Sequence, residues 1–344
     1  MKADRVVFRS YGEVSVLERE QVEVRAPGPG EILVDTAFAG INYADVIARR
    51  GFYKWAPPPP TCVGFEVSGT VAAVGPGVDA PRLGDRVAAV TRFGGYASRI
   101  VLEAVRTYVL PDEMSLEHGA AIPAVYMTAW HSLMEIARVR PGETILIQAV
   151  AGGVGLAALE LCKHQGLVTY GTASTADKLA FARGRGLDHG IDYQREDFEQ
   201  AILRETGGRG VDVVLDSLGG EGLRKGYRCL ARCGRVVTIG AAQVAPTSRR
   251  DPRALLAAGV ELVRGGVFHP FQLIEDNRSI AGVQILLLWD DMPRLRRGMD
   301  ALFALYREGA IRPHVDRVFG IDEIGEAHRL LETRRSKGKL LLRF

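Results

Sequence analysis

The chain has 344 residues, of which 47% are hydrophobic and 25% charged. These values are typical of a soluble globular protein, and the length suggests two domains. The net charge of +3 is too small to indicate a nucleic-acid partner or a charged membrane surface. No run of about 18 apolar residues is present, and residues 1–5 lack the apolar core of a signal peptide, so we expect a cytoplasmic protein without membrane insertion.

The first third of the chain has the pattern of short strands between glycine and proline turns. The strand signals lie at 6–8, 31–38, 65–75 and 84–90. Many short strands at such spacing favour a barrel-like domain. The pattern of residues 40–53 predicts a turn followed by one short helix, which ends at a glycine. Asn42 precedes that helix, so an N-cap is the alternative to any chemical role for its side chain.

From Arg140 the pattern changes to alternating strands and helices. Strands are predicted at 143–149, 167–173, 190–192, 211–216 and 234–240, with a sixth at 279–283. This alternation predicts a doubly wound parallel sheet. An apolar helical segment at 119–135, interrupted by Pro123 and Thr128, connects the two regions. An amphipathic helix at 292–309 precedes a last strand at 339–342, which we expect to return to the first domain.

The strand at 143–149 leads directly into the pattern Ala149-x-x-Gly152-x-x-Gly155 and then a helix. Strand, glycine-rich turn and helix in this order make a dinucleotide-binding element. Gly152 lets the backbone approach a pyrophosphate, and Gly155 lets the helix pack close to the strand. The N-terminus of the helix presents N–H groups and partial positive charge to phosphates. An ordinary tight turn is the alternative.

The cysteines are Cys62, Cys162, Cys229 and Cys233. They form no C-x-x-C pair and have no histidine partners at zinc spacing. We therefore expect reduced thiols, which agrees with a cytoplasmic protein.

Several segments together resemble one family. They are Asn42-Tyr43-Ala44-Asp45, Gly84-Asp85-Arg86-Val87, Ala151-Gly152-Gly153-Val154-Gly155 and Asp216-Ser217-Leu218-Gly219-Gly220. Over essentially its full length the chain resembles the zinc-independent medium-chain dehydrogenases/reductases, specifically the zeta-crystallin-like quinone oxidoreductases, and among them the vesicle amine transport protein homologues. The resemblance implies an α/β fold with a GroES-like catalytic domain (1–124), a Rossmann domain (125–283) and a return to the catalytic domain (284–344). It also implies a cleft between the domains and, commonly, a homodimer.

The same resemblance argues against a metal. Zinc-dependent members carry Cys where this chain has Asn42, and His where it has Phe65. Neither amide nor phenyl group supplies the thiolate and imidazole that zinc requires. Because alcohol dehydrogenation in that family depends on a metal to polarise the oxygen, we expect hydride transfer to an electrophilic acceptor, a quinone or an α,β-unsaturated carbonyl.

The cofactor is predicted to be NADPH. NAD-selective sites place an acid at the end of the second strand, whereas here that strand ends at Ser174. The resemblance implies that Lys178 and Tyr193, assisted by Ser174, bind the 2′-phosphate. Asp177 is the alternative: it would favour NADH if it bound the ribose, although its position also fits a capping box that begins at Ser174.

The resemblance also implies the site residues. Asn42 and Tyr53 would contact the hydride acceptor, with Asn42 bonding the acceptor oxygen, while Ile47 stands where quinone reductases often carry an aromatic residue. The expected cofactor contacts are Asn42, Thr128, Gly152, Gly153, Val154, Gly155, Ser174, Lys178, Tyr193, Leu218, Gly240 and Ala241. Two alternatives stay open: an enoyl-thioester reductase, with Arg49 and Arg50 as the basic patch for an anionic tail, and a non-catalytic NADPH-binding protein.

Overall fold

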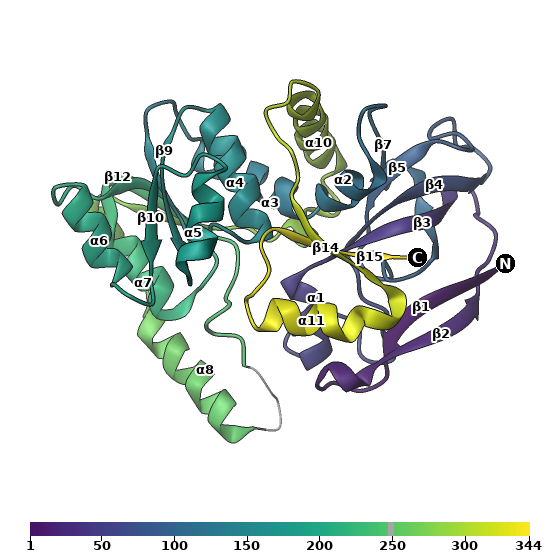
Figure 1. Ribbon diagram of the computed structural model, residues 1–344, viewed down its shortest axis with the longest axis horizontal. Coiled ribbons are helices and arrows are strands. Elements are labelled where there is room, and N and C mark those ends of the chain that lie inside the picture. Colours follow the sequence, from purple (N-terminus) through teal and green to yellow (C-terminus); the bar gives the residue numbers. More distant parts are fainter. Residues whose placement is uncertain (247–250) are drawn as a thin grey trace. The chain divides into compact units, whose positions relative to one another are not determined.

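The structure is a computed structural model that describes residues 1–246 and 251–344. Its contacts divide the chain into two compact units. Unit 1 comprises Met1–Met127 and Leu286–Phe344, and unit 2 comprises Thr128–Ile285 (Figure 1). The boundaries expected from the sequence, after residues 124 and 283, lie close to these divisions. The expected fold class is confirmed: a GroES-like β unit accompanies a unit built on a parallel sheet.

Unit 1 is mainly antiparallel. Its strands are β1 (Lys2–Phe8), β2 (Leu17–Glu23), β3 (Glu31–Ile41), β4 (Glu66–Val74), β5 (Arg86–Val90), β6 (Arg99–Glu103), β7 (Thr107–Val109), β14 (Val315–Gly320) and β15 (Lys339–Arg343). β1 and β2 form a separate pair, and the remaining strands form one sheet in the order β14-β15-β3-β4-β5-β7, with β6 also paired to β3. The helices of this unit are α1 (Tyr43–Arg50), α2 (Leu116–Ala121), α10 (Met292–Arg307) and α11 (Ile324–Glu332).

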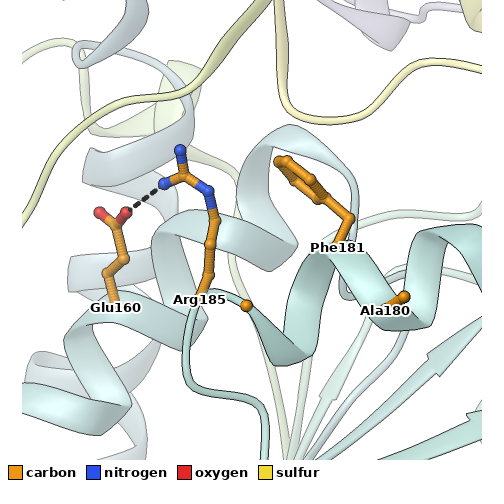
Figure 2. Close-up of a pocket in the computed structure, with 5 residues that line it drawn as sticks. Glu160, Ala180, Phe181 and Arg185 are labelled. Carbon is orange, nitrogen blue, oxygen red and sulfur yellow. Dashed lines mark hydrogen bonds and ion pairs between the residues drawn. The ribbon is translucent and has the colours of Figure 1, made fainter.

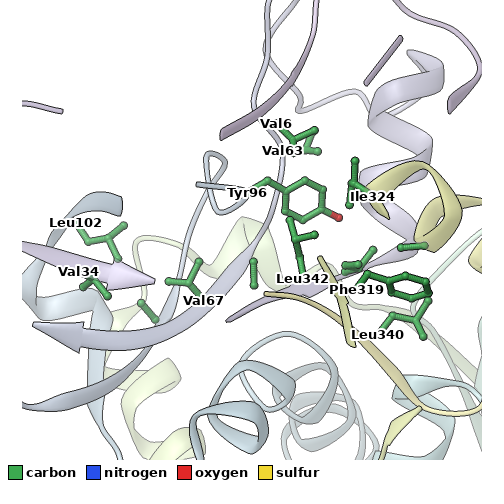
Figure 3. Packing of buried hydrophobic residues seen from close by; sticks show 14 of the residues in the cluster. Val6, Val34, Val63, Val67, Tyr96, Leu102, Phe319, Ile324, Leu340 and Leu342 are labelled. Atoms are coloured by element: carbon green, nitrogen blue, oxygen red, sulfur yellow. The ribbon is translucent and has the colours of Figure 1, made fainter. Parts of the chain in front are cut away.

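The last strand of the chain completes the sheet of unit 1. β15 pairs antiparallel with β3, and Leu340 lies opposite Ile41. Leu340 and Leu342 are fully buried in the same apolar cluster as Val67 and Tyr96 (Figure 3). Because Leu340 is opposite Ile41, the next position in the antiparallel register brings Lys339 beside Asn42. The sequence end therefore contributes a side chain to the neighbourhood of the predicted site.

Unit 2 contains a six-stranded parallel sheet in the order β10-β9-β8-β11-β12-β13. Its strands are β8 (Thr144–Ile147), β9 (Val168–Ala173), β10 (His189–Asp192), β11 (Val211–Asp216), β12 (Leu230–Thr238) and β13 (Ser279–Gly282). Its helices are α4 (Gly153–His164), α5 (Ala176–Arg183), α6 (Phe198–Glu205), α7 (Gly220–Arg228), α8 (Pro252–Gly265) and α9 (Pro270–Asp276). Ile145, Leu146 and Ile147 are fully buried, as expected for a central strand covered on both faces.

The helical segment expected at 119–135 differs in detail. It forms α2, then α3 (Val125–Trp130), then a π-helical stretch at His131–Ala137. The break between α2 and α3 contains Pro123, whose ring and missing N–H oppose a continuous helix. Thr128, by contrast, lies inside α3 and does not interrupt it. The short 3₁₀ turns are Val14–Val16, Ala104–Arg106, Ile285–Leu288 and Ile321–Glu323.

Candidate cofactor and acceptor sites

The residues predicted to bind a dinucleotide follow the carboxyl ends of five parallel strands. Gly152 follows β8, Ser174 follows β9, Tyr193 follows β10, Leu218 follows β11 and Gly240 follows β12. Parallel strands end at one edge of the sheet, so all five loops share that edge. The strand order also reverses between β8 and its neighbours β9 and β11. Such a switch point is where open α/β sheets bind their ligands.

The turn between β8 and α4 is held by close backbone contacts. A β-carbon on Gly155 would lie 2.4 Å from the carbonyl oxygen of Ala149, so only glycine fits this helix–strand contact. Gly152 is the N-cap of α4 and brings no capping side chain. Ala149 itself has φ +51, a conformation that costs a non-glycine residue energy and is common at functional turns. The N-terminus of α4 is thus free of a side-chain cap and suited to bind phosphate.

The loops after β11 and β12 are joined by a buried carboxylate. Asp216 is fully buried; it accepts hydrogen bonds from the Leu218 amide at 3.2 Å and from the Thr238 hydroxyl at 2.7 Å. Burial raises the pKa of Asp216 to about 6. The carbonyl oxygen of Leu218 also accepts from the Gln243 amide at 2.8 Å. Leu218 and the segment containing Gly240 and Ala241 are therefore held side by side.

The residues predicted to select NADPH lie at neighbouring strand ends. Ala173 of β9 is opposite Asp192 of β10, and the Tyr193 amide donates to the Ala173 carbonyl at 3.2 Å. Ser174 and Tyr193 are consequently adjacent in the sheet register, and α5, which contains Lys178, begins two residues after Ser174.

The expected capping box at Ser174 is wrong by one residue. Thr175 is the N-cap of α5, and its hydroxyl accepts from the Lys178 amide at 3.3 Å. Asp177 therefore occupies the second helical position rather than the third, and its first-turn placement is favourable for an acid. Thr128, the remaining cofactor prediction in unit 2, lies in α3, where its carbonyl accepts from the Ser132 hydroxyl at 2.7 Å.

In unit 1, Asn42 is the N-cap residue of α1, as the alternative had it, but its side chain is engaged elsewhere. Its backbone amide donates to Asp45 at 2.8 Å, which is one half of a capping box, but its side chain makes no capping bond to α1. Instead the side-chain amide donates to Glu66 at 3.0 Å and accepts from Lys339 at 2.7 Å. Burial raises the pKa of Asp45 to about 7.

An aromatic cluster surrounds the second predicted acceptor residue. Tyr53 lies edge-on to Trp55 and to Phe65, with ring centroids 5.3 Å and 5.6 Å away, and Phe65 lies 5.3 Å from Phe93. Sequence reasoning missed Trp55 and Phe93. The glycines that follow Phe93 mark a turn, but nothing in the sequence shows that this turn lies beside Phe65.

The two arginines considered for an anionic substrate tail do not form an exposed patch. The Arg49 side chain is fully buried and pairs with Glu332. Arg50 bonds the same carboxylate at 3.2 Å. Both guanidinium groups are paired with one carboxylate of the protein itself. The prediction that they form a basic patch for the anionic tail of an enoyl thioester is therefore wrong.

A surface hollow in unit 2 lies away from the predicted cofactor end of the sheet. It is lined by Glu160, Arg185 and the neighbouring part of α5, and Glu160 accepts from Arg185 at 2.8 Å (Figure 2). Glu160 belongs to the middle of α4, two turns beyond Gly153. The lining of this hollow therefore contains none of the residues predicted to bind the cofactor.

Within residues 1–246 and 251–344, no group of three or more His, Cys, Asp and Glu side chains is arranged to hold a metal ion. Over the same residues, no helix combines the length and apolarity needed to cross a bilayer.

A parallel sheet with a glycine-rich turn at its switch point, joined to a GroES-like unit, defines an NAD(P)-dependent oxidoreductase of the two-domain type. Residues 28–112 match the alcohol dehydrogenase GroES-like domain, and residues 185–342 match the zinc-binding dehydrogenase domain. The chain is 34% identical to the human synaptic vesicle membrane protein VAT-1 homolog, over 97% of this chain and 84% of that protein.

Solved structures agree with this similarity. The Escherichia coli quinone oxidoreductase complexed with NADPH superposes with a TM-score of 0.87 at 28% identity, covering 99% of this chain and 100% of that one. The CurK enoyl reductase gives 0.85 at 25% identity, covering 99% of each chain. The chain belongs to the medium-chain dehydrogenase/reductase family, in the branch that contains the VAT-1 homologues and resembles the zinc-independent quinone oxidoreductases.

Proposed function

We propose that this protein transfers hydride from NADPH to a quinone or an α,β-unsaturated carbonyl compound. The observation that carries the proposal is that the five loops predicted to bind the cofactor share one edge of the unit 2 sheet, on both sides of its switch point. The E. coli relative that superposes on the chain was solved with NADPH. Unit 2 would bind the cofactor, and unit 1 would supply Asn42 and Tyr53 to the reacting end.

The glycine-rich turn fits a dinucleotide. A β-carbon on Gly152 would meet only the Ala149 carbonyl, at 3.2 Å, so the backbone there is open on its outer side. Gly152, Gly153, Val154 and Gly155 would hold the pyrophosphate against the N-terminus of α4. When bound, NADPH supplies the hydride. The protein's part is to orient the nicotinamide and the acceptor so that the reacting atoms start close together.

The preference for NADPH over NADH rests on charge at the end of β9. That strand ends at Ala173 and is followed by Ser174 rather than an acid, and Lys178 and Tyr193 follow at the same edge of the sheet. A lysine beside the 2′-phosphate forms a charge-assisted hydrogen bond. Asp177 is exposed in the first turn of α5 and stays the competing candidate for an NADH preference.

The acceptor class rests on the aromatic cluster and on the residues at the two zinc positions. Tyr53 and Phe93, which both pack on the buried Phe65, offer apolar ring surface to a conjugated acceptor. A quinone or enone spreads the arriving charge over its own oxygen, so no metal is needed to polarise it. We accordingly propose that the chain holds no zinc. Elemental analysis of protein prepared without chelator, finding one tightly held zinc per chain, would contradict this.

The decisive experiment measures NADPH oxidation with a panel of quinones, enones and enoyl thioesters. The proposal predicts turnover with at least one quinone or enone. Turnover with thioesters should be slower, because Arg49 and Arg50 are paired with Glu332 and do not bind an anionic tail. Turnover of thioesters alone would favour the enoyl reductase. Tight NADPH binding with no turnover of any compound would favour a non-catalytic binding protein.

We also propose a cytoplasmic homodimer. All four cysteines are free thiols, as expected in a reducing compartment. Helix α8 packs on α7 through small residues: Gly265 is buried against Gly220. The large side chains of α8 point outward instead, with Leu256 70% and Val263 79% exposed. An apolar face of this kind marks an interaction surface, and α8 extends away from the rest of unit 2 (Figure 1).

A further inference from the structure

Asn42 belongs to a buried polar network that no sequence motif predicted. Lys339 is 3% exposed and Glu66 is fully buried, and the two form an ion pair. The Asn42 side chain completes the group: its oxygen accepts from Lys339 at 2.7 Å, and its nitrogen donates to Glu66 at 3.0 Å. The second oxygen of Glu66 accepts from the Ala124 amide at 2.6 Å.

These neighbours dictate which way the Asn42 amide points. A lysine ammonium has only donors, and an ionised carboxylate has only acceptors. Turning the amide by 180° would set its NH₂ against the Lys339 ammonium and its oxygen against the Glu66 carboxylate, which is unfavourable on both sides. The observed orientation is therefore the one that the charges of Lys339 and Glu66 impose.

This orientation uses up the donors of Asn42. One N–H lies toward Glu66, and the Gly40 carbonyl accepts from the same nitrogen at 3.3 Å. The oxygen keeps one lone pair beyond the bond from Lys339. Asn42 in this state can accept a further hydrogen bond but has no N–H left to give.

We propose that Lys339 and Glu66 are positioning residues that hold Asn42 as a hydrogen-bond acceptor for the cofactor. This rests on the proposed function. A quinone or enone oxygen is itself an acceptor, so an accepting Asn42 cannot bind it. The nicotinamide nucleotide carries ribose hydroxyls and a carboxamide NH₂, and these donate. Asn42 therefore contacts the cofactor rather than the acceptor oxygen, and Lys339 acts on cofactor binding without touching it.

The test observes the amide directly. Asn42 and Asn277 are the asparagines of the sequence, so protein labelled with ¹⁵N-asparagine gives two side-chain NH₂ groups, of which exposed Asn277 is the internal reference. In the wild type we expect the Asn42 NH₂ protons to exchange with water at least tenfold more slowly than those of Asn277. Neither NADP⁺ nor a quinone should displace them, so their protection from exchange should persist with either ligand, and a quinone should leave their shifts nearly constant.

The variant for comparison is the double substitution Lys339→Met with Glu66→Gln, which removes one charge of each sign. Lys339→Met alone would leave the buried Glu66 carboxylate without its cation and would threaten folding. In the pair the protection of the Asn42 NH₂ should fall toward that of Asn277. NADPH affinity should fall about tenfold, the value of one hydrogen bond. In an Asn42→Ala background the same pair should change NADPH affinity by less than twofold. Lys163→Met, at an exposed lysine paired with Asp188, is the matched control.

The outcomes separate the two proposals. Fast exchange of the Asn42 NH₂ in the wild type, a large shift of it on adding quinone, or additive losses in the Asn42→Ala background would overturn the positioning role. Failure of NADP⁺ to bind would overturn the proposed function, while the exchange measurement on the unliganded protein would still decide what Lys339 and Glu66 do.

Discussion

A β-carbon on Gly155 would lie 2.4 Å from the carbonyl oxygen of Ala149, whereas one on Gly152 would lie 3.2 Å from the same atom. The first contact cannot exist without moving α4, and the second needs only a small adjustment. The two glycines of this turn are therefore required for different physical reasons. Gly155 is constrained by packing inside the protein, and we propose that Gly152 is constrained by the ligand.

Alanine substitutions should separate these constraints. Gly155→Ala should lower the free energy of unfolding by about 1–3 kcal/mol, as overpacking does. Gly152 has φ −82, which alanine adopts without strain, but alanine is a poorer N-cap than glycine, so Gly152→Ala should cost at most about 1 kcal/mol of stability and weaken NADPH binding. Urea unfolding and NADPH fluorescence titration of both variants check this. A folded Gly152→Ala protein with unchanged NADPH affinity would mean that the pyrophosphate does not lie there.

Lys178 is expected to decide between the two nicotinamide cofactors. Its charge-assisted bond to the 2′-phosphate would contribute about 1.5–3 kcal/mol. Lys178→Ala should therefore weaken NADPH about 10- to 100-fold and leave NADH nearly unaffected. Titrating both cofactors against the wild type and the variant measures this, and Lys163→Ala, at a lysine beyond the first two turns of α4, is the control.

A wild-type preference for NADH would point to Asp177. If Asp177 binds the ribose instead, the wild type prefers NADH, because the carboxylate repels the phosphate. A wild-type preference for NADH would end the NADPH assignment, and Asp177→Asn would then be the variant that shifts preference toward NADPH.

The fold class was predictable from the sequence because its signals are local. The alternation of apolar strands and amphipathic helices after Arg140 predicts the parallel sheet, and the strands appear close to where the pattern places them. Residues 119–135 were harder, because a proline marks a break in the helix but nothing local distinguishes the π-helical stretch at His131–Ala137 from an α-helix.

The environment of the candidate site was not predictable in the same way. Lys339 is separated from Glu66 by 273 residues and looks like an ordinary charged residue before an apolar strand. Only the β3–β15 register brings it to Asn42. The burial of Arg49 is hidden for the same reason, because its partner Glu332 belongs to α11 near the other end of the chain. Sequence spacing informs on turns and helix caps, but not on which distant side chains neutralise one another.

The exposed face of α8 provides a test of the homodimer. Leu256→Lys with Val263→Lys should convert a dimer of twice the 37.4 kDa chain mass into a monomer, because each protomer would bring two charges to the interface. Sedimentation velocity measures the mass. Leu83→Lys is the matched control, since Leu83 is also 70% exposed but lies in unit 1. A wild type that sediments as a monomer would contradict the homodimer at once.

The last prediction concerns His328, which is fully buried in unit 1. Its Nε2 lies 3.3 Å from the Tyr96 hydroxyl, and its Nδ1 has no hydrogen-bond partner. Burial lowers the pKa of His328 to about 3, with Arg49 and Arg50 adding repulsion. An unfolded histidine has a pKa near 6.5, so between about pH 6.5 and pH 3 the unfolded chain binds the extra proton. Stability from this group is therefore complete above about pH 6.5 and is lost as the pH falls, by up to about 1.4 kcal/mol for each pH unit.

His328→Phe should isolate that contribution, because phenylalanine keeps a ring beside Tyr96 and cannot titrate. At pH 7.5 the variant should be less stable than the wild type by about 1 kcal/mol, the value of the lost hydrogen bond. The difference should shrink as the pH is lowered, reverse in sign near pH 6 and reach about 1 kcal/mol in favour of the variant at pH 5. Asp45, whose pKa is raised to about 7, acts in the opposite direction and shares Tyr96 with His328, so the comparison is repeated in an Asp45→Asn background. Urea unfolding of both proteins at pH 5, 6, 7 and 8 measures the difference. A stability difference that stays constant across this range would show that His328 titrates alike in the folded and unfolded chains.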